Sequence, residues 1–278
     1  MSSASDSIFL QIFNSIGSGK RIAVLISAFF DESTDGDANN GLLAVCGYAL
    51  DKAGLEKFIP EWQAMNTLYR VPYFHMAECN NNCDKFSHLS SEECDLCARE
   101  AIRLARTYPL HGHCYVLDQA EYREILQNQG FDCDPYTFMV WSAFVHVNNW
   151  VEKNKPDHQI SLFFENGYKT EPRSAELLRA FSKESWRGKN RVSSHSFVKK
   201  ECSEPAQAGD LIAWHVRKSY QNMREGRPIR ADSRALFKGR ENWTINWTAE
   251  RLKAISADFC KVSGNLETAS KTLFALAK

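Results

Sequence analysis

Short apolar runs alternate along the chain with longer stretches of helical periodicity. Residues 21–30 and 42–50 have the composition of two buried strands, and a polar stretch rich in Asn, Asp and Gly at 35–41 predicts a turn between them. Apolar positions three and four residues apart then predict a helix over 55–68, followed by an extended piece at 71–75. The first third of the chain is therefore expected to form a hairpin and a helix.

The same two patterns continue to alternate. Further strands are expected at 111–117, 159–164 and 194–199, and further helices at 90–107, 119–129, 135–153, 171–183 and 205–220. Ser90 with Glu93 predicts a capping box at the start of one of these helices. A short amphipathic helix near 5–16 and a helical end over 244–277 complete the expected elements. Strands that alternate with helices predict an α/β fold, a mixed sheet flanked by helices with helical insertions and a C-terminal helical extension.

The composition is that of an ordinary globular chain. Its 278 residues are 44% hydrophobic and 24% charged, which excludes a disordered, collagen-like or coiled-coil protein. Glycines and prolines are scattered and do not form a linker. We expect one elaborated domain over 1–278, with a core at about 20–220 and a basic loop plus C-terminal helices at 221–278.

Charge is unevenly distributed, although the formal net charge is zero. Residues 1–164 carry 12 Lys or Arg against 21 Asp or Glu, a balance of −9, and residues 165–240 carry 17 against 9, a balance of +8. An acidic part beside a basic part is typical of a metal site next to a track for a polyanion. Solvated faces of opposite charge are the plainer alternative.

Membrane insertion and secretion are not expected. The apolar run at 22–30 is about half of what spans a bilayer, and no Lys or Arg precedes the apolar residues at 8–13. Nine cysteines, an odd number without regular spacing, are typical of a reducing compartment. We therefore predict a cytoplasmic protein.

Acidic residues stand at the ends of apolar segments. Asp31 and Glu32 follow the first strand, Glu165 follows another, and Asp210 lies within an apolar helix. A buried lone carboxylate is costly unless it is paired or binds a metal, and oxygen ligands favour magnesium or manganese. The structural alternative is that Asp31 caps a turn, Glu165 is exposed and Asp210 pairs with an arginine.

Four short motifs carry a resemblance to a known family. They are Phe-Phe-Asp-Glu-Ser at 29–33, Phe-His-Met-Ala-Glu at 74–78, the strand that ends at Glu165, and Gln-Ala-Gly-Asp-Leu-Ile-Ala at 207–213. Together they resemble domain of unknown function family 3800 over roughly residues 20–220. That family is similar to the ribonuclease H-like superfamily, whose sheet displays an acidic cluster that binds two magnesium ions.

The resemblance implies a role for each matching residue. Asp31 would bridge both metals, Glu165 and Asp210 would each supply one ligand, Glu78 would be the fourth acid, and His75 would handle protons or support a ligand. The chain has Thr34 where the family commonly has Gly. It also has Glu165 where Asp is common, and the extra methylene would weaken the hold on a second metal. Asp118, at another strand end, is the reserve acid.

A zinc site is a separate hypothesis. Cys79, Cys83, Cys94 and Cys97 are spaced so that four thiolates could bind zinc, with His88 as a substitute ligand. The alternative is that Cys94 and Cys97 lie on one buried face of a helix.

A basic stretch follows the Asp210 helix. Between residues 217 and 240 eight Lys or Arg accompany only two acids, with aromatic residues interleaved. Arg217, Lys218, Arg224, Arg227, Arg230 and Lys238 are the predicted nucleic-acid contacts, and Arg187, Lys189 and Arg191 would extend them. A solvated loop of the same composition is the alternative.

The first functional hypothesis is a nuclease in which two magnesium or manganese ions activate water for in-line attack on a phosphodiester of DNA or RNA. Lys169, four residues beyond Glu165, would orient that water or stabilise charge. The second hypothesis is a module of the same fold that has lost catalysis and binds nucleic acid or a protein partner. A phosphatase acting on a smaller substrate is the third, and a homo-oligomer stays open.

Overall fold

The computed structural model describes residues 24–35, 41–181, 191–239, 242–265 and 267–269. Its described part contains a six-stranded sheet with the strand order β5-β4-β1-β2-β3-β6. The strands are β1 (Val24–Thr34), β2 (Leu42–Asp51), β3 (His111–Asp118), β4 (His158–Glu165), β5 (Val192–Val198) and β6 (Asn242–Trp247).

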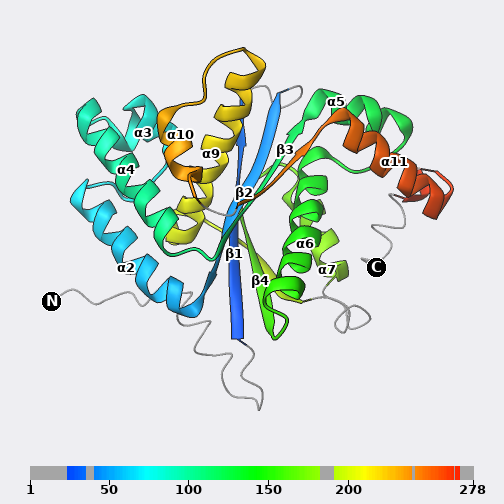
Figure 1. The fold of residues 1–278 in the computed structure, drawn as a ribbon, viewed down its shortest axis with the longest axis horizontal. Coiled ribbons are helices and arrows are strands. Elements are labelled where there is room, and N and C mark those ends of the chain that lie inside the picture. Colours follow the sequence, from blue (N-terminus) through cyan, green and yellow to red (C-terminus); the bar gives the residue numbers. More distant parts are fainter. Residues whose placement is uncertain (1–23, 36–40, 182–190, 240–241, 266, 270–278) are drawn as a thin grey trace.

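Helices cover both faces of this sheet (Figure 1). On one face lie α2 (Lys52–Leu68), α3 (Met76–Asn81), α4 (Ser91–Thr107), α9 (Glu204–Arg224) and α10 (Ala231–Phe237). On the other lie α5 (Gln119–Ile125), α6 (Pro135–Asn154), α7 (Glu171–Phe181) and α11 (Ala249–Ser263). Short 3-10 turns are η1 (Asp84–Phe86), η2 (Gln127–Gln129) and η3 (Lys200–Cys202).

Strand directions make the sheet mixed. β2 is antiparallel to both β1 and β3, whereas β4 is parallel to β1, β5 to β4 and β6 to β3. Parallel neighbours need long crossovers, and the helices on the two faces supply them. The predicted fold class, an α/β mixed sheet flanked by helices, is confirmed.

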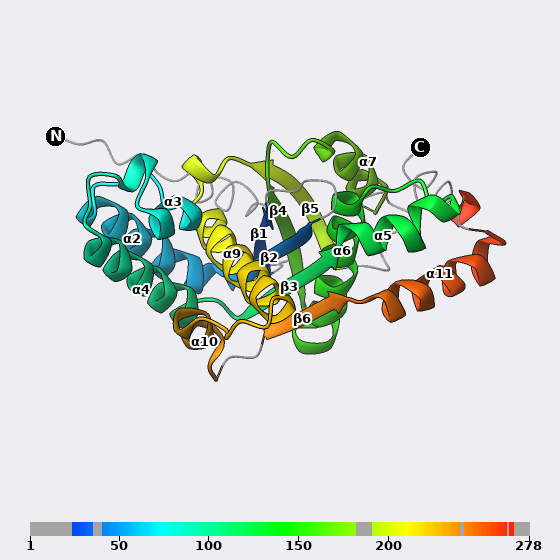
Figure 2. The same ribbon diagram turned by 90° about the horizontal axis from the view of Figure 1, so that it is seen from above.

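Each face of the sheet has its own hydrophobic core. Alternation along β1 sends Phe29 into the core beneath α2, α4 and α9, and Phe30 into the core beneath α6. Helix α9 lies against β1, β2 and β3, and Figure 2 shows it running diagonally across them. Whatever α9 presents to the sheet is therefore enclosed between helix and strands.

Several predicted elements are confirmed, and three are corrected. The capping box is present, because the Ser90 side chain accepts from the Glu93 amide while the Glu93 carboxylate accepts from the Ser90 amide. Strand β1 does not end at residue 30 but continues to Thr34, because its antiparallel pairing with β2 extends that far. The expected helix near 5–16 lies outside the described residues.

The expectation of a helix over 244–277 is wrong in its first part. Asn242–Trp247 forms β6, which pairs with β3 and buries Ile245 and Trp247. Alternating apolar residues that include a β-branched side chain and an aromatic one favour a half-buried strand. A helix, α11, starts only at Ala249. The basic stretch is not one loop either, since α9 runs to Arg224 and α10 covers Ala231–Phe237.

None of the helices in the described ranges is both long and apolar enough to cross a membrane.

Candidate functional site

Asp31 and Glu165 are brought together where the β1–β4 ladder ends. The parallel pairing stops at Phe30 opposite Phe164, and the two acids are the next residue on each strand. Both stand two residues beyond the stacked rings of Phe29 and Phe163, whose centroids are 4.7 Å apart. Because strand side chains alternate, both carboxylates face the same side of the sheet as those rings, the side covered by α9.

Helix α9 supplies the third acid. Its Gln-Ala-Gly-Asp motif places Gly209 against β1, where an added Cβ would lie 3.2 Å from the Asp31 amide nitrogen. Because Gly209 has no side chain, α9 can approach β1 closely. The next residue of the helix, Asp210, is thereby brought to the same centre as Asp31 and Glu165. Asp31 is 1% exposed and Asp210 is 6% exposed.

A lysine that the sequence analysis did not select lies at the centre of these acids. The Nζ atom of Lys200 is 2.8 Å from Asp31 Oδ2, 3.1 Å from Glu165 Oε2 and 3.0 Å from Asp210 Oδ1. Lys200 is 7% exposed and begins η3, two residues after Val198, which pairs with Glu165. No local pattern in the sequence marks it, because only the parallel pairing of β5 with β4 brings it next to Glu165.

The electrostatics of this centre follow from burial. Burial raises the pKa of Asp31 well above its ordinary value, although the Lys200 ammonium opposes that shift. Burial by itself lowers the pKa of Lys200, but the carboxylates of Asp210, Asp31 and Glu165 outweigh it and raise that pKa. The surrounding carboxylates thus favour the charged form of Lys200.

His75 and Glu78 lie beside the centre. The His75 Nε2 atom is 3.5 Å from Asp210 Oδ1, and its Nδ1 atom is 2.9 Å from Glu78 Oε1. The same Glu78 oxygen is 2.6 Å from Lys85 Nζ. Glu78 therefore reaches the buried acids through the imidazole of His75 and is not itself one of the carboxylates around Lys200.

Gln207, the first residue of the α9 motif, joins four segments. Its Oε1 atom accepts from Trp62 Nε1 at 2.8 Å, from Asn66 Nδ2 at 3.0 Å and from the Phe74 amide at 2.9 Å. Its Nε2 atom donates to the Lys200 carbonyl at 3.1 Å. One buried amide thus fixes α2, the segment that carries His75, and the backbone of Lys200 relative to Asp210.

Glu32 adds a fourth carboxylate. Ligand oxygens of Asp31, Glu32 and Glu165 all lie within 4.8 Å of one another, and this is the one group of that kind in the described part of the chain. Burial, followed by repulsion from Asp31, raises the pKa of Glu32 to about 8. Its buried Oε2 atom has no hydrogen-bond partner among the described residues. A buried carboxylate oxygen without a donor is what a hard cation would satisfy.

Two other candidates lie elsewhere. Asp118 accepts from the amides of Ala120 and Glu121 at the start of α5 and pairs with Arg224 at 2.7 Å. Its carboxylate is thus used as a helix cap and ion-pair partner. Lys169 is exposed.

The predicted nucleic-acid contacts do not form one uniform patch. Arg217 is 8% exposed and donates from Nε to Ser33 Oγ at 2.9 Å, two residues beyond Asp31. Arg224 pairs with Asp118, Arg227 with Glu225, and Arg230 with Asp232. Lys218 is only partly exposed and donates to Gln221. Arg187 and Lys189 lie outside the described residues.

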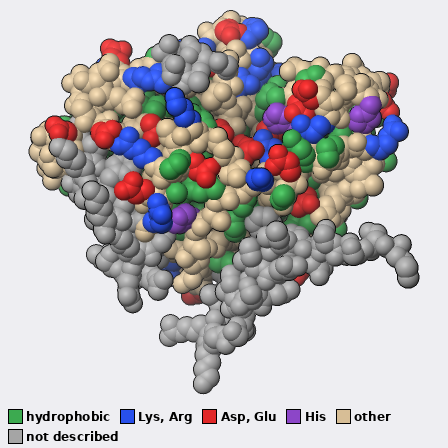
Figure 3. All heavy atoms as spheres, turned by 180° about the vertical axis from the view of Figure 1, so that it is seen from behind, with side chains coloured by type: hydrophobic (Ala, Val, Ile, Leu, Met, Phe, Trp, Pro, Cys, Tyr) green, Lys and Arg blue, Asp and Glu red, His purple; other side chains and the backbone are tan. Residues whose placement is uncertain are grey.

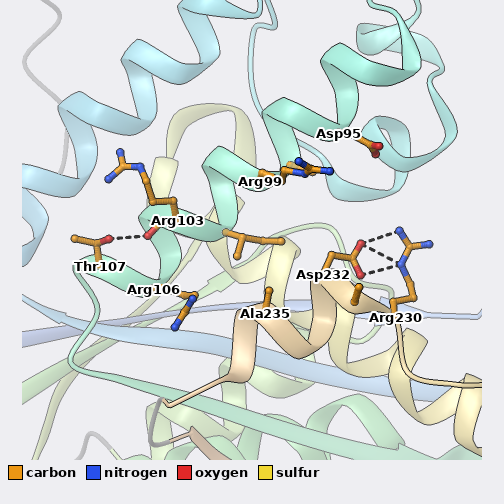
Figure 4. Close-up of a pocket in the computed structure, with 11 residues that line it drawn as sticks. Asp95, Arg99, Arg103, Arg106, Thr107, Arg230, Asp232 and Ala235 are labelled. Atoms are coloured by element: carbon orange, nitrogen blue, oxygen red, sulfur yellow. Dashed lines mark hydrogen bonds and ion pairs between the residues drawn. The ribbon is translucent and has the colours of Figure 1, made fainter.

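Arg230 also borders a groove of about 1070 Å³ between α4 and α10, shown in Figure 4. Its guanidinium stacks on the Trp214 ring at 5.3 Å. Arg99 and Arg106 of α4 line the same groove, and Arg106 donates to the Lys238 carbonyl. On the opposite side of the molecule, acidic and basic side chains are interspersed (Figure 3).

The four cysteines do not form the suggested zinc site. Cys83 Sγ contacts Asp84 at 3.4 Å, while the buried Cys79 donates to the Cys94 carbonyl. Cys94 and Cys97 are buried on one face of α4, as the alternative interpretation predicted. His88 contacts the Tyr69 carbonyl. Within the described residues no set of cysteine ligands converges.

Similarity to known proteins is low. No protein-family model and no curated protein matches the chain. Among solved structures, a glutamine-to-alanine mutant of Bst-RNase HIII aligns over 92% of this chain and 70% of its own, with 16% identity and a TM-score of 0.44. Bst-RNase HIII in complex with Mn²⁺ aligns over 93% and 72%, with 15% identity and a TM-score of 0.41. Because both TM-scores are below 0.5, the function of the site follows from its own geometry alone.

Proposed function

We propose that this chain is a divalent-metal-dependent nuclease of the ribonuclease H-like type, which hydrolyses phosphodiester bonds of DNA or RNA with magnesium or manganese. The observation that supports it best is the meeting of Asp31, Glu165 and Asp210, from two strands and a helix, at one buried point. Burying several carboxylates together is unfavourable for folding alone, which favours a functional reason for the arrangement.

The residues present fit a hard divalent cation. Asp31, Glu165 and Asp210 are the ligands expected from the sequence, and the orphaned oxygen of Glu32 adds a further donor. Oxygen-only donors suit magnesium or manganese. A bound ion of this kind supplies a Lewis acid that polarises a phosphoryl oxygen and makes water more acidic.

His75 is suited to move a proton at the edge of this centre. Glu78 and Lys85 hold the imidazole through its Nδ1 side, and the Nε2 side faces Asp210. A protonated ring donates to both carboxylates and can pass the Nε2 proton to a leaving oxygen. Glu78 fixes the orientation of the ring through its contact with Nδ1.

Arg217 is the predicted phosphate contact with the strongest structural support. Its guanidinium is buried, yet none of the ion pairs found among the described residues involves it. Its hydrogen bonds go to the neutral Ser33 and Gln221 side chains. The Asp35 carboxylate acts on Arg217 electrostatically but forms no ion pair with it among the described residues, so a substrate phosphate beside Ser33 would supply a direct charged partner. Lys218, Arg224, Arg227, Arg230 and Lys238 are proposed to hold the more distant backbone.

One observation favours the alternative of a catalytically inactive module that binds nucleic acid. Lys200 already neutralises part of the acidic centre, as the side chain of a degenerate metal site would. In that case nucleic acid would bind without a metal and with strong salt dependence.

Cleavage assays decide between the two. The purified chain is incubated with labelled single-stranded, double-stranded and hybrid DNA or RNA, with Mg²⁺, Mn²⁺ or EDTA. We expect metal-dependent cleavage that Asp31→Asn and Asp210→Asn each reduce by about a hundredfold or more. The matched control is Asp157→Asn, the same change at an exposed acid just before the opposite end of β4.

Cleavage that both variants retain would refute the proposal. Binding without cleavage in any metal would support the inactive module. A chromogenic phosphoester, hydrolysed while polynucleotides are not, would instead indicate a phosphatase.

A further inference from the structure

The Lys200 ammonium lies where a cation is expected in an acidic centre. Three carboxylates from β1, β4 and α9 approach its Nζ atom to between 2.8 and 3.1 Å, and each comes from a different element. Since the lysine is buried and its backbone carbonyl is held by Gln207, this placement is built into the fold. An ammonium and a metal ion cannot share the space between the same three oxygens.

The carboxylate of Asp210 is committed to protein donors on both oxygens. Oδ1 accepts from Lys200 at 3.0 Å, and Oδ2 accepts from the Met76 amide at 2.6 Å. Although the sequence predicts Asp210 as a metal ligand, it is not part of the group whose ligand oxygens converge within 4.8 Å. Its contacts favour a role in holding Lys200 and the His75 segment.

Glu32 differs from Asp210 in its place among the converging oxygens and in the hydrogen bonding of its carboxylate. It belongs to the converging group with Asp31 and Glu165, and its buried Oε2 atom has no hydrogen-bond partner among the described residues. Among the ion pairs of the described residues, the Lys200 ammonium reaches Asp31, Glu165 and Asp210 but not Glu32. The side of the centre that contains Glu32 is therefore the side left without a cation.

We infer that the centre takes one divalent cation, held by Asp31, Glu32 and Glu165, and that the Lys200 ammonium takes the place of a second cation beside Asp210. This inference rests on the proposed metal-dependent function and corrects its ligand set. Asp210 is then a positioning residue, and Glu32 is a ligand that the sequence analysis did not assign.

Manganese binding to the full chain tests the assignment without reference to activity. Free Mn²⁺ is measured by electron paramagnetic resonance during titration. We expect one ion per wild-type chain. Glu32→Gln should weaken its affinity about tenfold or more, as loss of a ligand does, whereas Asp210→Asn should change it by less than about threefold. Glu124→Gln, at an exposed glutamate of α5, is the matched control.

Lys200→Met supplies the second readout, because it keeps an apolar stem and removes the ammonium. This variant should bind two Mn²⁺ ions per chain. If it does not fold, as judged by circular dichroism, the comparison of Glu32→Gln with Asp210→Asn decides alone. Two ions in the wild type, an equal loss of affinity in both variants, or a folded Lys200→Met that still binds one ion would overturn the inference.

The outcomes separate this inference from the proposed function. Metal-dependent cleavage with two ions in the wild type refutes only the inference. One ion held by Glu32 in a chain that cleaves no substrate refutes only the proposed nuclease. A wild type that binds no Mn²⁺ refutes both.

Discussion

Gly209 of α9 lies directly against Asp31 of β1. A Cβ at position 209 would be 3.2 Å from the Asp31 amide nitrogen and 3.3 Å from the Asp31 Cβ. Both contacts are tighter than is normal for such atoms, and the neighbours are backbone and a short side chain in the middle of a sheet. The closeness of this helix–strand contact sets how far Asp210 reaches toward Asp31.

Gly209→Ala should therefore move α9 away from β1. Overpacking of this kind costs about 1–3 kcal/mol, against which the better helix propensity of alanine returns up to about 1 kcal/mol. We expect a net loss in the free energy of unfolding, measured in urea. A gain in stability, as at an open helical glycine, would show that the contact is not tight.

Gln207→Leu should be among the most destabilising single changes in the chain. It removes the acceptor of three buried donors, from Trp62, Asn66 and Phe74, and leaves them without a replacement. Each such group costs roughly 1–3 kcal/mol, so we expect a loss of about 3–5 kcal/mol in the free energy of unfolding. Equilibrium urea denaturation at neutral pH measures it.

Gln63→Leu is the matched control for that change. Gln63 is an exposed glutamine of α2 with one side-chain hydrogen bond, to Glu204. Its replacement should alter the free energy of unfolding by about 0.5 kcal/mol or less. Similar losses in the two variants would contradict the proposed role of Gln207 as the joint between four segments.

Local sequence patterns predict part of the fold and part of the candidate site. Hydrophobic periodicity located most strands and helices, and the acids at their ends, because both signals are local along the chain. That Asp31 and Glu165 face the same side follows only from the β1–β4 register, which no local pattern specifies. The convergence of three elements on one point therefore needed the fold.

Lys200 and Glu32 were missed for a related reason. A lysine after a strand is ordinarily exposed, and only the parallel pairing of β5 with β4 carries it in among the carboxylates. Glu32 was noted beside Asp31, but its convergence with Glu165 depends on where the β1–β4 ladder ends. The sequence predicts a helix where β6 lies because the pairing that makes it a strand is with β3, more than a hundred residues earlier.

Acid should destabilise the chain partly through His215. This histidine is fully buried between α9 and α10 and bonds to Ser233 Oγ at 3.0 Å. Burial is the main cause that lowers its pKa to about 4; nearby Asp232 and Asp210 raise the value and Arg230 lowers it. Because the unfolded chain takes up this proton near pH 6.5, stability is present above that pH and lost as pH falls toward 4.

The contribution of His215 is isolated by comparison with His215→Gln. The wild type should lose up to about 3 kcal/mol more than the variant between pH 6.5 and pH 4, measured by urea denaturation at each pH. Parallel stability profiles for the two proteins would show that His215 does not titrate abnormally in the folded chain.

Glu32 should contribute to stability in opposite directions with and without metal. In the metal-free chain its carboxylate lies beside Asp31 with an unsatisfied buried oxygen, so the neutral isostere in Glu32→Gln removes like-charge repulsion. We expect the metal-free variant to melt at a higher temperature than the metal-free wild type at pH 8 to 9. Saturating Mn²⁺ should then raise the melting temperature of the wild type more than that of the variant, since an ion that binds only the folded state stabilises it in proportion to the logarithm of its affinity. Scanning calorimetry of both proteins in EDTA and in Mn²⁺ measures whether the order of their melting temperatures reverses when the metal is added. A variant less stable than the wild type in EDTA would mean that Glu32 has a structural partner and is not a carboxylate kept for a cation.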